Sequence, residues 1–193
     1  MSLQPESYFT PEEYLEIERS ADYKSEYFNG QIFAMGGASP NHVLIVTNVV
    51  SEFRSQLKTR PCTVYSTDLR VRVSPTGLYT YPDVVVVCGT PDFSDTHSDT
   101  LTNPTLIVEV LFKSTKDYDR GEKFEQYRAI KTFVEYVLIA QDKHHVEHYN
   151  RQPDNTWILS ETNRVEDSIE LTSIGCKLAV SEIYDKVDLR QAG

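Results

Sequence analysis

The chain has 193 residues, of which 39% are hydrophobic and 25% are charged, so it has apolar material for a core and is not wholly disordered. Its 19 Lys and Arg and 29 Asp and Glu give a formal net charge of −10, which counts against indiscriminate electrostatic binding to nucleic acid or anionic membrane. No apolar run approaches the roughly 18 residues of a membrane span, and residues 1–18 lack the basic and apolar regions of a secretory signal. We therefore expect a cytoplasmic protein with a single domain over residues 1–193 and a core from about 8 to 185.

The three cysteines, Cys62, Cys88 and Cys176, are an odd number, lie far apart and have no C-x-x-C spacing. This pattern predicts neither a disulfide framework nor a zinc site. Cys88 ends an apolar run and Cys62 follows a proline, so we expect both to be small buried apolar residues.

The first elements have strong local signals. Residues 10–19 begin with a capping threonine, a proline and an acid three residues after the cap, which predicts a short helix. The Asn-Gly pair at 29–30 lies between two strand-like runs, 25–28 and 31–34, and predicts a β-hairpin. Residues 39–58 begin with Ser-Pro and carry an apolar stripe at spacings of three and four, which predicts a second helix.

The rest of the chain is predicted to contain several strands and one more helix. Strands are expected at 63–65, 68–73, 79–88, 105–111, 134–140, 145–149 and 157–159. Residues 91–104 are polar and predict an exposed loop, whereas 117–130 predict a helix. This order predicts an α/β (α+β) fold with one mixed central β-sheet flanked by helices, after an N-terminal helix and β-hairpin.

Two acids occupy strands that are otherwise apolar. Asp83 is followed directly by four valines, and Glu109 lies inside Leu-Ile-Val-Glu-Val-Leu. A buried carboxylate costs several kcal/mol unless it is paired, hydrogen-bonded or bound to a metal. Two hypotheses follow: a structural ion pair with Arg70, Arg72 or Lys123, or a site for a divalent cation such as Mg²⁺.

These acids belong to a set of six segments that stand in a fixed order along residues 8–185. The segments are Phe9-Thr10-Pro11-Glu12-Glu13-Tyr14-Leu15, Glu26 with Asn29-Gly30, Met35 with Ser39-Pro40-Asn41-His42, Tyr81-Pro82-Asp83, Ile107-Val108-Glu109-Val110, and Asp119-Arg120-Gly121-Glu122-Lys123-Phe124-Glu125-Gln126-Tyr127. In this order they resemble the Uma family of the PD-(D/E)XK nuclease superfamily, whose members are restriction-endonuclease-like.

The resemblance implies a restriction-endonuclease-like fold and metal-dependent hydrolysis of phosphodiester bonds, with DNA as the substrate. By this resemblance Asp83 and Glu109 hold Mg²⁺ (or Mn²⁺), and the ion polarises the phosphate and acidifies a bound water. Lys123 then orients that water or stabilises charge on the phosphoryl oxygens. Glu26 matches the additional N-terminal acid of the superfamily.

Two further side chains are candidates for the same site. Tyr127 lies four residues after Lys123 on one helix face and is predicted either to hydrogen-bond a phosphate or to fill the core. His42, at the start of its helix, is predicted either to contact the site or to be a cap or surface residue.

The lysine itself departs from the superfamily pattern. Its usual position, two residues after the acid, is Leu111, and the resemblance places the family's lysine at Lys123 in the following helix. Lys113 is an alternative, because the period of a strand puts it on the face of Glu109. We expect the functional lysine to line a solvent-filled cleft and to contribute little to packing.

Two alternatives to a nuclease stay open on function. A catalytically inactive nuclease-fold binding or regulatory module is favoured by the net charge and by Leu111, and a hydrolase of a smaller phosphoester needs less basic surface. The strands from 146 to 159 predict a homodimer, because an unpaired edge there is a pairing hazard. His144, His145 and His148 are expected at the surface or an interface, and Trp157 in core or interface packing.

Overall fold

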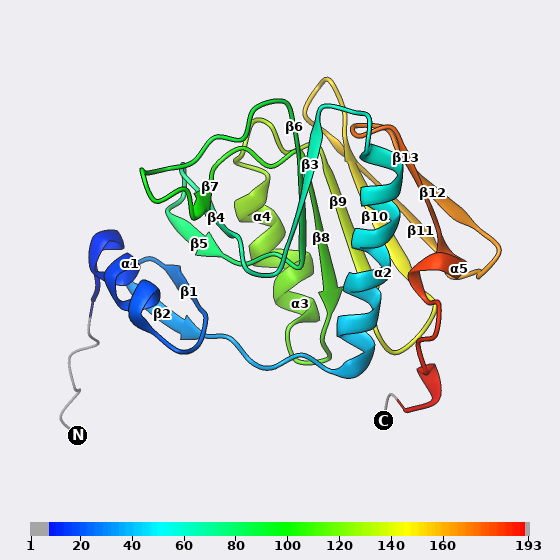
Figure 1. Cartoon of the computed structure of the whole chain (residues 1–193), viewed down its shortest axis with the longest axis horizontal. Coiled ribbons are helices and arrows are strands. Elements are labelled where there is room, and N and C mark those ends of the chain that lie inside the picture. The colour runs from blue at the N-terminus through cyan, green and yellow to red at the C-terminus, as the bar shows by residue number, and fades with distance from the viewer. Residues whose placement is uncertain (1–7, 192–193) are drawn as a thin grey trace.

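The computed structural model describes residues 8–191 and contains two large β-sheets (Figure 1). The larger sheet has six strands in the order β11-β10-β9-β8-β6-β3. These strands are β3 (Cys62–Ser66), β6 (Val84–Cys88), β8 (Leu106–Leu111), β9 (Glu135–Ala140), β10 (Val146–Arg151) and β11 (Trp157–Thr162). The sheet is mixed, because β8 and β9 run parallel whereas the other neighbours are antiparallel.

The second sheet has five short strands in the order β2-β1-β5-β4-β7, and a separate hairpin pairs β12 with β13. These elements are β1 (Ser25–Phe28), β2 (Gln31–Ala34), β4 (Arg70–Val73), β5 (Leu78–Thr80), β7 (Thr100–Leu101), β12 (Ser168–Leu171) and β13 (Cys176–Ala179). The hairpin is followed by helix α5 (Val180–Ile183) and a 3₁₀ turn at Leu189–Gln191.

The elements with strong local signals form as predicted. Helix α1 (Pro11–Ser20) begins with a complete capping box between Thr10 and Glu13. Strands β1 and β2 pair through a turn at Asn29 and Gly30, which have φ of 49° and 82°. A two-residue hairpin turn of this kind needs positive φ at both positions, which asparagine and glycine tolerate best.

Helices cover both faces of the six-stranded sheet (Figure 1). Helix α2 (Pro40–Leu57) packs on one face against Val84, Val108 and other residues of the core. The segment that contains α3 (Lys116–Tyr118) and α4 (Phe124–Tyr127) covers the opposite face. Because successive residues of a strand alternate between faces, Glu109 is directed away from α2 and toward α4.

Three predictions about the sheets are wrong. Residues 79–88 are not one strand, since β5 and β6 belong to different sheets, and the strands from 68 to 140 therefore do not form one sheet. The break falls at Tyr81-Pro82-Asp83, where proline has no backbone N–H to donate to a ladder. Residues 91–104 are not only loop, because β7 lies within them and pairs in parallel with β4, and both of its residues are fully buried.

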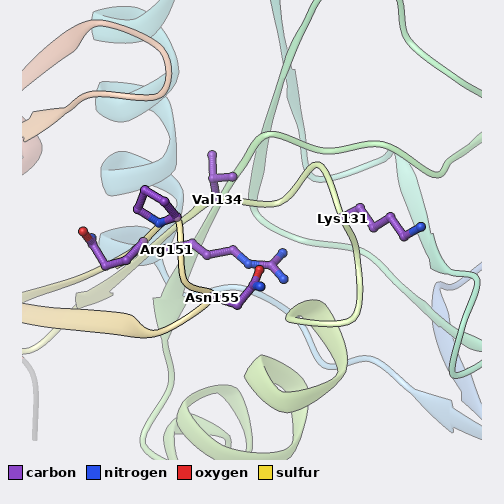
Figure 2. Close-up of a pocket in the computed structure, with 6 residues that line it drawn as sticks. Lys131, Val134, Arg151 and Asn155 are labelled. Atoms are coloured by element: carbon purple, nitrogen blue, oxygen red, sulfur yellow. The ribbon is translucent and has the colours of Figure 1, made fainter.

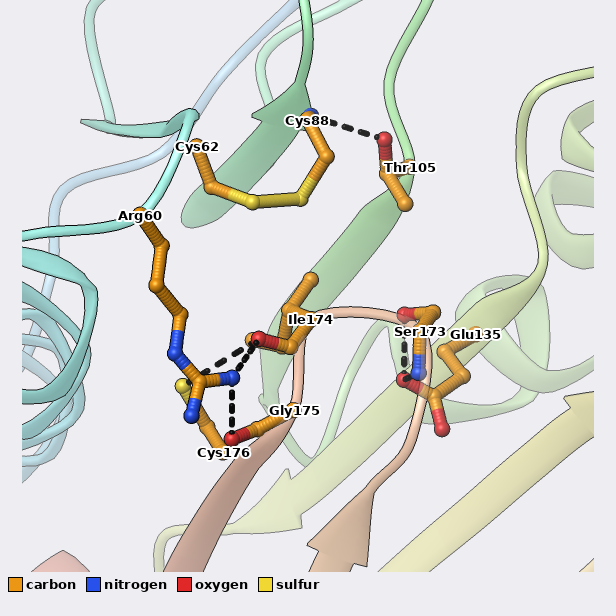
Figure 3. Close-up of a disulfide and its surroundings, with 9 residues drawn as sticks. All are labelled: Arg60, Cys62, Cys88, Thr105, Glu135, Ser173, Ile174, Gly175 and Cys176. Atoms are coloured by element: carbon orange, nitrogen blue, oxygen red, sulfur yellow. Dashed lines mark hydrogen bonds between the residues drawn. A yellow bond between two sulfur atoms is a disulfide. The ribbon is translucent and has the colours of Figure 1, made fainter.

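The cysteine prediction is also wrong, because Cys62 and Cys88 form a disulfide between β3 and β6 (Figure 3). The two residues are direct partners in the antiparallel register, with their Cα atoms 4.0 Å apart. Cys176 is buried with a free thiol. A separation of 26 residues gives no local signal of a disulfide, so only the pairing of the strands brings the two sulfurs together.

The predicted helix 117–130 is present but irregular. Its middle, Asp119–Lys123, is a π-helical turn between α3 and α4. Single π-helical turns inside helices occur frequently at functional sites. Among the helices of residues 8–191, none is both long and apolar enough to cross a membrane.

Candidate active site

Asp83 and Glu109 face each other at one end of the six-stranded sheet. The antiparallel register pairs Val84 with Val108, so the next position on each strand is Asp83 opposite Glu109. The Asp83 backbone N–H donates to Glu109 Oε2 at 3.3 Å, and the Val110 N–H donates to Asp83 Oδ2 at 2.7 Å. The two acids therefore lie side by side, Glu109 within β8 and Asp83 directly before β6.

Lys123 lies among the acids of this site. Its Nζ is 2.9 Å from Glu109 Oε1, 3.2 Å from Glu26 Oε1 and 3.6 Å from Asp119 Oδ1. The residue is only 5% exposed, so the expectation that it lines a solvent-filled cleft is wrong. Of the three ion-pair partners predicted for the buried acids, Lys123 is the one present: Arg70 is paired with Asp99 instead.

Tyr127 and Glu26 complete the contacts around the lysine. The Tyr127 hydroxyl donates to Glu109 Oε1 at 2.9 Å, while its ring packs in the core on the α4 side of the sheet. Glu26, on β1, accepts hydrogen bonds from the hydroxyls of Thr80 and Tyr118. The second sheet thus supplies one carboxylate to a site built on the first.

His42 reaches the same site from the start of α2. Its Nε2 is 3.1 Å from Asp83 Oδ2, and its ring stacks on Phe112 with centroids 4.9 Å apart. The side chain is buried, and Nδ1 has no hydrogen-bond partner. The contact of Nε2 with Oδ2 restrains the Asp83 carboxylate.

Burial dominates the electrostatics of the site. It raises the pKa of Glu109 to about 8, and the nearby Asp83 and Asp119 carboxylates act in the same direction, although Lys123 opposes them. Burial alone lowers the pKa of Lys123, but the surrounding acids, Glu109 first, hold that pKa well above its usual value. Lys123 therefore stays protonated at neutral pH, whereas burial and the neighbouring acids disfavour the charged form of Glu109.

The sequence analysis missed three contributors: Asp119, Tyr118 and Thr80. Asp119 is buried, accepts a hydrogen bond from the Thr115 hydroxyl at 3.0 Å and lies four residues before Lys123. Its position within the same segment as Lys123 was a usable signal, because residues four apart share a helix face. Thr80 carried no such signal, since its place beside Glu26 depends on the pairing of β1 with β5.

The donor set suits a hard divalent cation. Mg²⁺ binds one or two carboxylates and fills its remaining positions with waters and substrate phosphates. Asp83 and Glu109 supply two such carboxylates, and Asp83 Oδ1 accepts no hydrogen bond from any residue between 8 and 191. A cation between the two acids relieves their mutual repulsion, which is one cause of the raised pKa of Glu109.

The histidines predicted at the surface lie elsewhere in the sheet. His148 is buried and bonds Glu135, so the surface prediction is wrong for it. His145 Nε2 lies 3.3 Å from Glu147 and 3.4 Å from Glu161. Within residues 8–191, His145, Glu147 and Glu161 are the only group of three or more metal-ligating side chains close enough to share one ion. Glu147 already has a cationic partner, because Arg120 forms an ion pair with it.

A separate hollow of about 640 Å³ lies between the start of β9 and the turn after β10. Figure 2 shows Arg151 and Asn155 close together at this hollow, with Lys131 directed away from them. None of the predicted site residues lines it. Trp157 packs beside Phe133 in the core, as one of its two predicted alternatives stated.

The structure combines a mixed sheet that has helices on both faces with two acids at the end of adjacent strands and a lysine from the following helix. This combination defines a protein of the restriction-endonuclease-like superfamily. The model of the family Uma2, described as "Putative restriction endonuclease", matches residues 11–181. The chain belongs to the Uma2 family, and the resemblance seen in its six segments is confirmed.

Individual proteins agree with this assignment. The chain is 38% identical over 175 residues to the uncharacterized protein slr1290 of Synechocystis, covering 91% of this chain and 90% of that one. It is 36% identical over 163 residues to the uncharacterized protein sll1609 of the same organism, covering 84% and 92%. A crystal structure from Anabaena variabilis, described as "a putative nuclease belonging to DUF820", superposes with a TM-score of 0.74 at 16% identity, covering 93% of this chain and 99% of that one. At this identity the likeness shows the fold.

Proposed function

We propose that this protein is a metal-dependent endonuclease that hydrolyses phosphodiester bonds in DNA. The observation that carries the proposal is the contact of Glu109 with both Asp83 and Lys123 at the end of β6 and β8. One or two carboxylates can hold Mg²⁺ together with a substrate phosphate, and an ammonium group can stabilise charge on that phosphate.

Each side chain has a role that follows from its contacts. Asp83 and Glu109 hold Mg²⁺ or Mn²⁺, which when bound supplies a Lewis acid and a water of lowered pKa. Lys123, kept charged by its acidic neighbours, stabilises charge on the phosphoryl oxygens or orients the attacking water. His42 fixes the rotamer of Asp83 through the contact of Nε2 with Oδ2.

Glu26 and Tyr127 act on the lysine and on Glu109 rather than on the substrate. Glu26 pairs with the Lys123 ammonium group, and the Tyr127 hydroxyl fixes Glu109 Oε1. Both contacts restrict the orientation of the groups that meet the phosphate, and a fixed orientation is worth much of the catalytic effect.

The test combines plasmid cleavage with thermal unfolding. We expect Mg²⁺ or Mn²⁺ to support nicking and to raise the melting temperature of the parent. Glu109→Gln keeps the shape of the side chain but removes its charge, so it abolishes both effects. Glu125→Gln, an exposed position on α4, is the matched control and retains both. Absence of a metal-dependent shift in the parent contradicts the proposal.

One observation favours the second candidate function, a catalytically inactive binding or regulatory module. Lys123 is buried and held by Glu109, Glu26 and Asp119, and Leu111 occupies the superfamily's usual lysine position. A structural network of this kind predicts no cleavage and no response to Mn²⁺, together with loss of stability when either partner is removed.

We also propose a homodimer in the cytoplasm, with residues 1–193 as one domain. Strand β11 is an edge of the six-stranded sheet and exposes Ile158 and Leu159, and an exposed apolar edge is prone to pair with another chain. Light scattering at tens of micromolar tests the dimer, and a monomeric mass refutes it.

A further inference from the structure

Phe33 is a large aromatic side chain that the fold leaves in solvent beside the candidate active site. It lies on β2, the edge strand of the five-stranded sheet, and is 50% exposed. The register of the hairpin makes Glu26 its direct cross-strand partner. Directly opposed residues have their Cβ atoms about 4.5–5.5 Å apart on the same face of the sheet, so the Phe33 ring lies next to the Glu26 side chain.

That face of the hairpin is the one that meets the site. Tyr27 and Ile32 are on the other face and pack against α1. Glu26 contacts Lys123 Nζ at 3.2 Å, and Phe28, next along the same face, packs into the core beside α4. Phe33 alone on this face has no core to enter, because β2 is the outermost strand.

The short helix α3 lies against the hairpin at Glu26. The Tyr118 hydroxyl is 3.4 Å from Glu26 Oε2, which holds the short helix α3 against the hairpin. The first residue of α3 is Lys116, which is exposed. The exposed Phe33 ring therefore lies next to the partly buried Glu26 carboxylate, which also contacts Tyr118 and Lys123. Rings for the bases and cations for the backbone are how proteins hold single-stranded nucleic acid.

We propose that Phe33 is a stacking platform for an unpaired nucleobase, so that the protein engages single-stranded or locally melted nucleic acid beside Glu26. The proposal rests on the proposed function for the identity of the ligand, since a phosphodiester at Asp83 and Glu109 places neighbouring nucleotides along this face. The net charge of −10 agrees with this mode of binding, because stacking adds affinity that does not depend on a strongly basic surface.

The experiment measures binding without cleavage. A fluorescein-labelled single-stranded oligodeoxynucleotide and its duplex are titrated in EDTA, with fluorescence anisotropy as the readout, against the full chain and four variants. Phe33→Ala removes the ring, Phe33→Leu keeps apolar area without a π face, and Phe33→Tyr keeps the ring. Val165→Ala is the matched control, since Val165 is 45% exposed in the turn between β11 and β12, two strands that lie across the molecule from β1 and β2 in Figure 1.

We expect Phe33→Ala and Phe33→Leu to weaken single-strand binding by about 5- to 150-fold, the range for loss of one stacked base. Phe33→Tyr and Val165→Ala stay within about twofold of the parent, and duplex binding changes less than single-strand binding. Because the ring is half-exposed, thermal unfolding of the variants verifies that each is folded before it is titrated.

Four results overturn the inference: no single-strand binding by the parent, an unchanged affinity for Phe33→Ala, a Phe33→Leu variant that binds like the parent, or a dimer that Phe33→Ala converts to a monomer. The last result assigns the ring to a second copy of the chain. Failure of the proposed function gives a different result. If single-strand affinity depends on the Phe33 ring but no metal-dependent nicking occurs, this inference holds and the nuclease is rejected. If nicking occurs and does not depend on Phe33, the nuclease holds and this inference is rejected.

Discussion

Replacing Lys123 by methionine tests the electrostatic description of the site most directly. The substitution keeps the length of the stem and removes the ammonium group, which leaves Glu109, Glu26 and Asp119 without their shared cation. We expect a loss of stability that grows with pH. Glu109 already has a raised pKa, so the charge that the substitution orphans is that of Glu26. At 3.2 Å from Lys123 Nζ the lost attraction is about 5 kcal/mol for an effective dielectric constant of 20, against which stands the relief of no longer burying the lysine.

Protonation sets the upper limit of the net loss. A carboxyl group that loses its partner escapes by taking up a proton, which costs about 1.36 kcal/mol for each pH unit above its unfolded pKa of about 4.3. That limit is about 4 kcal/mol at pH 7.5 and about 1 kcal/mol at pH 5 for one orphaned group. The pKa of such a group is higher in the folded state than in the unfolded state. The free energy of unfolding of the variant is therefore not reduced below the unfolded pKa, and it decreases as pH rises above that value.

The assay is urea unfolding at pH 5 and pH 7.5 in EDTA, followed by circular dichroism. We expect Lys123→Met to lose about 3–4 kcal/mol at pH 7.5, within the range for breaking a buried pair, and about 1 kcal/mol at pH 5. Lys113→Met, at an exposed position near the end of β8, is the control and changes little at either pH. A loss below about 1 kcal/mol at pH 7.5, or an equal loss at both pH values, refutes the reasoning.

Two further predictions concern the covalent and ionic ties of the fold. The two disulfide-bonded cysteines are 26 residues apart in the sequence, for which the chain-entropy relation gives up to about 3.5 kcal/mol of stabilisation. Replacing Cys62 and Cys88 by alanine removes this stabilisation. Dithiothreitol is therefore expected to destabilise the parent but not the variant. When the parent is denatured without a reductant, one alkylating label is expected, at Cys176, and after reduction three labels are expected. Three labels before reduction would contradict the disulfide. Arg19 holds the pKa of Asp99 well below its usual range through a direct hydrogen bond, so Arg19→Gln is expected to cost about 1 kcal/mol at pH 7 for this partly exposed pair. A depressed carboxyl pKa stabilises above the unfolded value, and this stabilisation is lost only as pH falls through the folded pKa. The cost is therefore expected to shrink steadily below about pH 4, and a cost that is the same at pH 7 and pH 2.5 excludes the ion pair as its origin.

Local signals determined the elements around the site. The capping residues of α1 and the Asn29-Gly30 turn act within a few residues of chain, so their structure is fixed by short-range sterics and hydrogen bonds. The two acids inside apolar strands were visible for a related reason. A carboxylate in a buried strand needs a partner, and that requirement identified Asp83 and Glu109 before any partner was located.

The tertiary structure decided which groups meet. The sequence alone left Lys113 beside Lys123 as a candidate amine, and packing of α4 on the sheet places Lys123 against Glu109. The disulfide and the contact of Thr80 with Glu26 both depend on strand pairing over tens of residues. No local pattern encodes such pairing, because the register between distant strands is set by burying whole apolar faces at once.

The burial of Lys123 has the same origin. From the sequence, a lysine on a helix is expected to reach water with its ammonium group, whereas here two sheets and a π-helical turn enclose it with three carboxylates. The chain therefore determined by itself the residue types of the site and the short elements that carry them. The tertiary structure alone determined their mutual distances and their exclusion from water, because both arise from contacts between segments remote in the sequence.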